Sequence, residues 1–440
     1  MLERVPGGAA NVQDIYPLAP LQEGILYHHI TARQGDPYLL QSHMAFADRA
    51  LFTAFTQALQ QVIARHDILR TGVFWEGLQQ PLQVVLRNAE LVVHEERLDP
   101  AAGDILGQLH ELCDARHHRM DITRAPLMRV HMAQDPVQGR IVAVVLFHHL
   151  ALDHTAMDVV GHELRAFLQG QGQNLGTPVP YRNYVAQARL GVSEQEHEAF
   201  FRDMLGDVDE PTLPFDLQDV QGDGGDIEER SQALPSALSA RLRHQARLLG
   251  VSAASLFHLA WARVLGATSG KQAVVFGTVL LGRMQGGEGA DRALGMFINT
   301  LPLQVEIDAT GVRDGVRATH RRLSALLGHE HASLTLAQRC SGVAAPLPLF
   351  SAMLNYRHSQ DSSAPTAPPA SAHGIETLAG EERTNYPLSL NVDDRGEGFS
   401  LTAMSPADFF RLPNGSTIAT GTRSTQIATR VSGPTPWRRR

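Results

Sequence analysis

The residues whose types and spacing could support chemistry are a histidine pair and a nearby aspartate, His148-His149-x-x-x-Asp153. The pair follows the apolar run RIVAVVLF (140–147), which is typical of a strand buried on both faces. Loops at strand ends often carry functional side chains. Successive strand residues point to opposite faces, so only one histidine of the pair can face a given cavity. A neutral imidazole there could take a proton from an attacking amine, or hydrogen-bond to it.

Asp153 precedes a helical pattern, TAMDVVGHELRAFLQ (155–169), so its carboxylate suits a helix cap, an ion pair or the orientation of an imidazole. Two other interpretations stay open. The two histidines could be core residues beside a helix cap. Alternatively, His149, Asp153 and His154 could bind a metal, although their spacing matches no zinc motif.

Other reaction classes lack their motifs in this sequence. It contains no GxSxG nucleophile elbow, no GxGxxG and no HExxH. The segment GATSGK (266–271) is one residue short of a phosphate-binding loop and lacks the final Ser or Thr. Lys271 is the single lysine, so it is the one candidate for Schiff-base chemistry.

Around these residues the sequence predicts alternating helices and strands. The predicted helical segments are 20–33, 51–65, 155–169, 236–265 and 313–331. The predicted strands are 127–134, 140–147, 273–281, 297–307 and 347–357, with a hairpin over 386–404. Each half of the chain alternates in this way, which predicts two α/β lobes.

A Gly/Pro-rich break at 170–183 is the candidate boundary, so we expect one lobe over 1–175 and a second over 176–404. The acidic stretch 207–229 is predicted to be a solvated loop. Residues 405–440 carry six arginines and one acid without apolar periodicity. We expect this tail to be disordered or aberrant, because it cannot bury an apolar face.

Composition excludes several classes of function. The 440 residues carry a net charge of −8, which argues against nucleic-acid binding. The sequence has no apolar run of about 18 residues, so no membrane helix is predicted. The N-terminus also lacks the apolar core of a signal peptide. Cys113 and Cys340 form no disulfide framework, so a cytoplasmic location is expected.

Six segments follow one another along the chain: YPLAPLQEG (16–24), RHDILRT (65–71), HHLALDH (148–154), VPYRNYVAQ (179–187), MFINTLPLQ (296–304) and HEHASL (329–334). Together they resemble the motifs of condensation domains of nonribosomal peptide synthetases. HHLALDH corresponds to the active-site motif HHxxxDG. The resemblance spans residues 14 to about 404. The sequence departs from the family at His154, where glycine is usual, and at Gln304, where arginine is usual.

The resemblance implies two lobes, each like chloramphenicol acetyltransferase, in a V-shaped pseudo-dimer with HHxxxDG at the centre of a tunnel. It implies donor and acceptor peptidyl carrier proteins as partners, each presenting a phosphopantetheine thioester, beside domains such as an adenylation domain. No cofactor of the chain's own is implied. His149 would be catalytic, as base or as hydrogen-bond positioner of the amine, with His148 and Asp153 supporting it within the catalytic motif. Arg283, as an ion-pair partner of Asp153, and His154 would be structural support.

A second motif points to a subtype. His28-His29-Ile30-x-x-x-x-Gly35-Asp36 resembles HH[I/L]xxxxGD, the extra motif of dual epimerization/condensation domains. Such domains invert the donor residue from L to D before condensation. That inversion needs an acid/base group at the α-carbon, so His28, His29 and Asp36 are the epimerization candidates. The alternative interpretation is a polar helix end followed by a Gly-Asp turn.

Peptide bond formation with epimerization of the donor is therefore the predicted function. One alternative is a plain condensation domain without epimerization. Another is a truncated, inactive fragment that only binds carrier proteins, which the unusual tail suggests.

Overall fold

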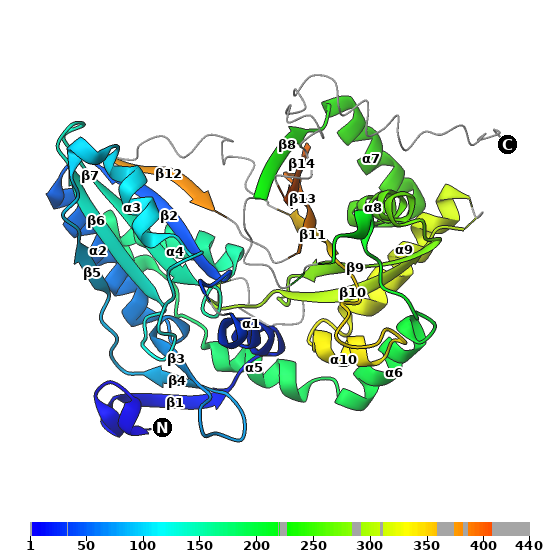
Figure 1. Ribbon diagram of the computed structural model, residues 1–440, viewed down its shortest axis with the longest axis horizontal. Coiled ribbons are helices and arrows are strands. Elements are labelled where there is room, and N and C mark those ends of the chain that lie inside the picture. The colour runs from blue at the N-terminus through cyan, green and yellow to red at the C-terminus, as the bar shows by residue number, and fades with distance from the viewer. Residues whose placement is uncertain are drawn as a thin grey trace.

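The computed structural model describes residues 2–32, 34–218, 220, 227–283, 292–308, 311–358, 374–381 and 386–406. They form two α/β lobes, as predicted. Figure 1 shows the lobes side by side, joined near α1 and α5 and separated toward the top of the view. The predicted disordered tail lies outside the described residues, apart from Ser405 and Pro406, which end a strand.

The first lobe contains two sheets. One has the strand order β1-β4-β3, and the other has the order β12-β2-β7-β6-β5. Their strands are β1 (Val12–Pro17), β2 (Leu39–Phe46), β3 (Thr71–Phe74), β4 (Leu82–Leu86), β5 (Val92–Glu95), β6 (Met128–Asp135), β7 (Arg140–His148) and β12 (Ile375–Glu381). The strands predicted over 127–134 and 140–147 are confirmed as β6 and β7, which pair antiparallel.

Four helices accompany these sheets. They are α1 (Pro20–Thr31), α2 (Arg49–Arg65), α3 (Ile105–Cys113) and α4 (His154–Leu168). α2 begins where Asp48 accepts a hydrogen bond from the backbone nitrogen of Leu51 at 2.8 Å. Its apolar residues recur at helical spacing and are buried on one face, against the sheet and α4. Short 3₁₀ helices lie at Leu2–Arg4, Gly8–Asn11, Ile68–Arg70, Pro100–Ala102, Gly172–Asn174 and Pro214–Asp216.

Strand β2 shows which helix covers which face of the five-stranded sheet. The ring of Phe46 packs against Phe52 and Phe55 of α2, with ring centroids 5.4 and 5.1 Å apart. On α3, Nδ1 of His110 lies 3.3 Å from Nε2 of His43. Residues 43 and 46 point to opposite faces of the strand, so α2 and α3 cover opposite faces of the sheet. β7, in the middle, is therefore buried on both sides.

The second lobe is built on one six-stranded sheet with the order β10-β9-β11-β13-β14-β8. The strands are β8 (Ile227–Ala233), β9 (Ala273–Leu280), β10 (Asn299–Glu306), β11 (Ala352–His358), β13 (Leu388–Asp394) and β14 (Phe399–Pro406). The helices after residue 175 are α5 (Tyr181–Leu190), α6 (Glu194–Leu205), α7 (Ser236–Leu249), α8 (Ala253–Ser269), α9 (Val312–Leu327) and α10 (Leu334–Arg339). β13 and β14 form the predicted hairpin.

Two expectations for this half need correction. The helical segment 236–265 is two helices, because Gly250 ends α7 in the left-handed conformation with φ 67°. The acidic stretch 207–229 is not all loop, because Ile227, Glu228 and Glu229 pair with β14. Among the described residues, no single helix is long and apolar enough to cross a membrane; α7 and α8 meet that test only as a pair bent by 106°.

Several segments after residue 175 belong to the first lobe, so the predicted division at residue 175 is too simple. β12 belongs to the range expected for the second lobe, yet it pairs antiparallel with β2 at the edge of the first-lobe sheet. Ala293, Leu294, Met296 and Phe297 are likewise buried in the hydrophobic core of the first lobe. Tyr181, Tyr184, Val185 and Ala188 of α5 lie in the same core, so at least three segments expected in the second lobe pack in the first.

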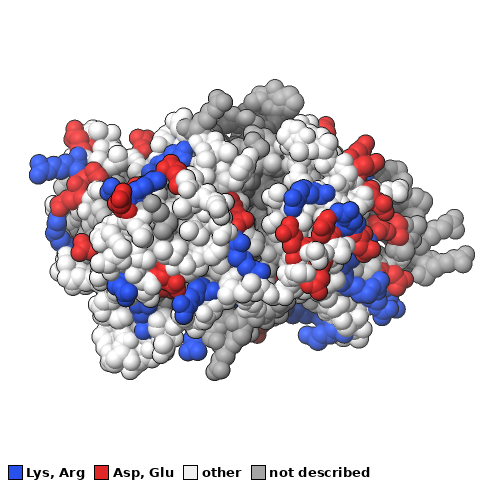
Figure 2. All heavy atoms as spheres, turned by 90° about the horizontal axis from the view of Figure 1, so that it is seen from below, with Lys and Arg blue, Asp and Glu red and all other residues white. Residues whose placement is uncertain are grey.

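Charge on the surface agrees with the mixed composition. Figure 2 shows basic and acidic side chains interspersed on the face seen from below, separated by uncharged surface. The described residues of that face offer no continuous basic area for a nucleic-acid backbone.

Candidate active site between the lobes

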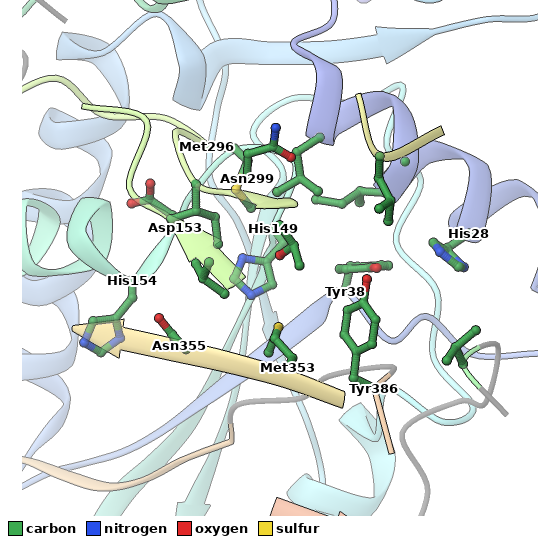
Figure 3. A pocket seen from close by; sticks show the side chains of 18 of the residues that line it. His28, Tyr38, His149, Asp153, His154, Met296, Asn299, Met353, Asn355 and Tyr386 are labelled. Atoms are coloured by element: carbon green, nitrogen blue, oxygen red, sulfur yellow. The ribbon is translucent and has the colours of Figure 1, made fainter. Parts of the chain in front are cut away.

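A cavity of about 1050 Å³ lies between the two lobes. Its first-lobe wall comes from α1, β2 and the loop after β7, and its second-lobe wall from residues on β9, β10, β11, β13 and β14. Figure 3 shows the ring of His149 among the lining side chains, with His28 and His154 at opposite sides of the view. The cavity lies where the sequence resemblance implies a tunnel, and it brings His28, His149, Asp153 and His154 to one space.

His149 follows β7 directly, and two hydrogen bonds fix its place. Its backbone nitrogen donates to the carbonyl of Tyr38 at 2.9 Å. Its ring Nδ1 lies 2.9 Å from the carbonyl oxygen of Leu152. A carbonyl can only accept, so Nδ1 carries the proton of this contact. In the neutral ring Nε2 then has the lone pair, which is the form that can accept a hydrogen bond or a proton from an amine.

His148 points the other way and is fully buried. Its Nδ1 accepts a hydrogen bond from the backbone nitrogen of Leu150 at 3.1 Å. Its Nε2 lies 3.0 Å from Oδ2 of Asp36, and Nδ1 of His29 lies 2.5 Å from that same oxygen. Thus two residues of the proposed epimerization motif contact the first histidine of HHLALDH. The sequence predicted each motif but not this contact between them.

The residue types of the His29–Asp36–His148 cluster are those of a metal site, but the ring proton of His148 is on the wrong nitrogen for one. One atom from each residue lies within 4.8 Å of the others. Nδ1 of His148 accepts the Leu150 N–H, so the ring proton is on Nε2, the atom that would have to bind a metal. The cluster therefore fits a hydrogen-bonded network. Burial alone would raise the pKa of Asp36, but the hydrogen bonds from His148 and His29 hold it well below its usual range.

Asp153 is buried, and its carboxylate is bound to three groups of the protein. Its carboxylate caps α4 by accepting from the nitrogen of Ala156 at 2.7 Å, and it accepts from the nitrogen of Phe297 at 3.0 Å. Nη2 of Arg283 lies 3.2 Å from Oδ1, the ion pair expected from the sequence. These bonds occupy the carboxylate, which disfavours the metal site considered for His149, Asp153 and His154. They also tie the second-lobe segment around Phe297 to the loop that carries His149.

His28 differs from its neighbour His29, because it lines the cavity. Its ring centroid lies 5.8 Å from that of Tyr38, which in turn lies 6.4 Å from His149. Burial lowers the pKa of His28, which favours its neutral form near pH 7. Burial raises the pKa of Tyr38, which keeps its hydroxyl protonated.

Three of the remaining motifs meet around Tyr181, at the start of α5. In RHDILRT, Nε2 of His66 lies 2.8 Å from Glu163 on α4, and the carboxylate of Asp67 accepts from the nitrogen of Tyr181 at 3.1 Å. In VPYRNYVAQ, the Tyr181 hydroxyl donates to the carbonyl of Met296 at 2.6 Å. Gln304, a departure from the family, accepts from Arg322 at 2.8 Å.

Sequence reasoning missed two residues of the site. Tyr38 lines the cavity between His28 and His149, but a lone tyrosine in the segment GDPY has no spacing signal. Gln22 is buried, and its Nε2 donates to the carbonyl of Leu150 at 2.7 Å, within the turn that carries His149. The one sequence feature that could have indicated Gln22 is its place in the segment YPLAPLQEG.

Known proteins resemble this chain over most of its length. A malpinin synthetase from Mortierella alpina is 52% identical over 403 residues, which are 92% of this chain and 5% of the synthetase. A malpibaldin synthetase from the same organism is 50% identical over 91% of this chain and 7% of the synthetase. A linear gramicidin synthase polypeptide from Brevibacillus parabrevis is 30% identical over 88% of this chain and 5% of its own length. The chain thus spans a small fraction of each relative.

Solved structures share the fold at low sequence identity. A four-domain nonribosomal peptide synthetase gives a TM-score of 0.73 at 14% identity, covering 96% of this chain and 32% of that one. The starter condensation domain of a rhizomide synthetase gives 0.66 at 16% identity, covering 95% and 94%. The family model described as "Condensation domain" matches residues 12–421. The chain therefore belongs to the condensation-domain family.

Proposed function

We propose that the chain joins two carrier-bound substrates. The α-amine of an aminoacyl acceptor attacks the thioester carbonyl of an aminoacyl or peptidyl donor. The C–N bond forms as the C–S bond breaks; the amine loses a proton and the departing phosphopantetheine sulfur gains one. The partners are a donor and an acceptor peptidyl carrier protein within a larger synthetase.

One observation carries this proposal: Nδ1 of His149 is bound to the carbonyl of Leu152 at 2.9 Å, in a residue that lines the cavity between the lobes. This bond presents Nε2 as the acceptor for the attacking amine, as a base or as a positioning group. The volume of about 1050 Å³ suits the ends of two thioester arms. The test is a reconstituted reaction with loaded donor and acceptor carriers, read by mass spectrometry. Absence of any dipeptidyl product from folded protein would contradict the proposal.

A second activity, epimerization of the donor, is proposed for His28. His28 lines the same cavity as His149, and burial favours its neutral form, which can take a proton. The other candidates serve a different purpose in this proposal, because Asp36 is bound to His148 and His29 is bound to Asp36. The test is chiral analysis of the product formed from an L-donor. A product that retains only the L-residue would leave the chain a plain condensation domain.

A further inference from the structure

The two ring nitrogens of His148 have different and fixed partners. Nδ1 receives the backbone N–H of Leu150 at 3.1 Å, so this nitrogen must hold its lone pair toward Leu150. Nε2 faces Oδ2 of Asp36 at 3.0 Å. The observed turn after β7 therefore requires one tautomer of His148, neutral with its proton on Nε2, and Asp36 supplies the acceptor for that proton.

This turn contains the catalytic histidine. The nitrogen of Ala151 donates to the carbonyl of His148 at 3.0 Å, and the carbonyl of Leu150 accepts from Gln22 at 2.7 Å. His149 is bound to the carbonyl of Leu152 within the same five residues. A change at Nδ1 of His148 would move Leu150, and with it the ring of His149.

Asp36 is placed for this contact by its own loop. Its nitrogen donates to the carbonyl of Ala115 at 2.7 Å. Gly35 precedes it with φ +67°, and a Cβ there would lie 2.4 Å from the carbonyl oxygen of Arg116. Only glycine fits this conformation and this close approach. The Gly-Asp pair of the second motif is thus explained by the need to bring Asp36 against His148.

The carboxylate cannot be replaced by an amide without a conflict. Oδ1 of Asp36 accepts from the nitrogen of Tyr38 at 3.0 Å, while Oδ2 receives both His29 and His148. An asparagine amide has one acceptor end and one donor end. In either orientation its NH₂ group would meet an N–H, of Tyr38 or of the two histidines. The site is built for a group with two acceptor oxygens.

We propose that Asp36 is a positioning residue for peptide bond formation, which fixes the tautomer of His148 and thereby holds the turn that orients His149. The inference rests on the proposed role of His149. It gives Asp36 a function that is independent of epimerization. Asp36 acts through His148 and does not touch the reacting atoms.

The direct test needs no variant beyond the one used for assignment. Nitrogen-15 NMR of the histidine rings, with His148 assigned through its loss in His148→Asn, should show His148 neutral and protonated on Nε2 at about pH 7.5. A proton on Nδ1, or a doubly protonated ring, would overturn the inference. This result does not depend on activity, so it can be told apart from a failure of the proposed function.

The kinetic test is a double-mutant cycle with loaded carriers. Asp36→Asn should lower kcat of condensation on the order of 10- to 100-fold with little change in KM, because it misplaces a catalytic group. In His148→Asn the amide oxygen can accept the Leu150 N–H without help. Adding Asp36→Asn to that variant should therefore change kcat less than about twofold. Equal, additive losses in both backgrounds would contradict the coupling.

A matched control separates positioning from stability. Glu163→Gln breaks another buried histidine–carboxylate contact, with Nε2 of His66 at 2.8 Å, that has no link to the turn. It should lower the melting temperature but leave kcat per folded molecule unchanged. Wild-type kcat in folded Asp36→Asn would overturn the proposal. If Asp36→Asn does not fold, the NMR result on the native protein decides.

Discussion

Nδ1 of His149 lies 2.9 Å from the carbonyl oxygen of Leu152, three residues further along the chain. This bond is formed within one turn, so the ring orientation is set locally once the turn is in place. The turn itself depends on distant residues, because Gln22 binds Leu150 and Asp36 binds His148. The orientation of the His149 ring is therefore set by a local contact, and separate parts of the first lobe support the turn.

Asp153→Ala should reduce stability rather than chemistry. The change removes the cap of α4 and leaves Arg283, whose side chain is 10% exposed, without its carboxylate. Breaking a buried pair from one side costs about 3–5 kcal/mol. Chemical denaturation should show this loss, and Asp153→Ala with Arg283→Met should lose less than Asp153→Ala alone. A single-variant loss below about 1 kcal/mol would mean that the pair is not buried in solution.

Replacing His28 should separate the two proposed activities. His28→Phe keeps a ring beside Tyr38 but removes the acid/base group. We expect this variant to condense a supplied D-donor at the wild-type rate and to fail with an L-donor, as measured by chiral analysis of the dipeptidyl product. Loss of both activities together would show that the end of α1 serves structure, and retention of both would exclude His28 from epimerization.

Stability should fall in mild acid because of His258. This side chain is buried, with Nε2 2.7 Å from the hydroxyl of Thr278, and burial lowers its pKa to about 4. As the pH falls, the unfolded chain, with an ordinary histidine pKa, binds the proton before the folded chain does. The folded state therefore loses stability between about pH 6.5 and pH 4. His258 should lower the free energy of unfolding by about 2 kcal/mol between pH 7 and pH 5.

The measurement is the free energy of unfolding in urea at the two pH values. His258→Gln removes the titrating group, so its free energy of unfolding should change less than that of the wild type. An identical pH dependence in the two proteins would assign the acid sensitivity to other groups.

Local patterns predicted much of the fold. The amphipathic spacing of α2 and the apolar run of β7 predicted those elements, and the order of motifs predicted the family. Contacts between distant segments were not predictable in the same way. β12 pairs with β2, although more than 300 residues separate the two strands. The periodicity of a strand does not identify the strand with which it pairs.

The same distinction holds for the site. The places of His149 and Asp153 followed from one motif, and the Asp153–Arg283 pair was expected from the family resemblance. The different roles of His28 and His29 did not, because they depend on which side of α1 faces the cavity. Asp36 and His148 are 112 residues apart, and only the folded loop at Gly35 brings them together.

We propose that His149 is the catalytic group of condensation, and its replacement tests this role directly. His149→Ala should lower kcat on the order of 100- to 10,000-fold with loaded donor and acceptor carriers, because a positioned base or hydrogen-bond acceptor contributes about that much. Its melting temperature should stay close to that of the wild type. His162→Ala, which replaces an exposed histidine on α4, should keep wild-type turnover. Near-normal dipeptide formation by folded His149→Ala would contradict the account.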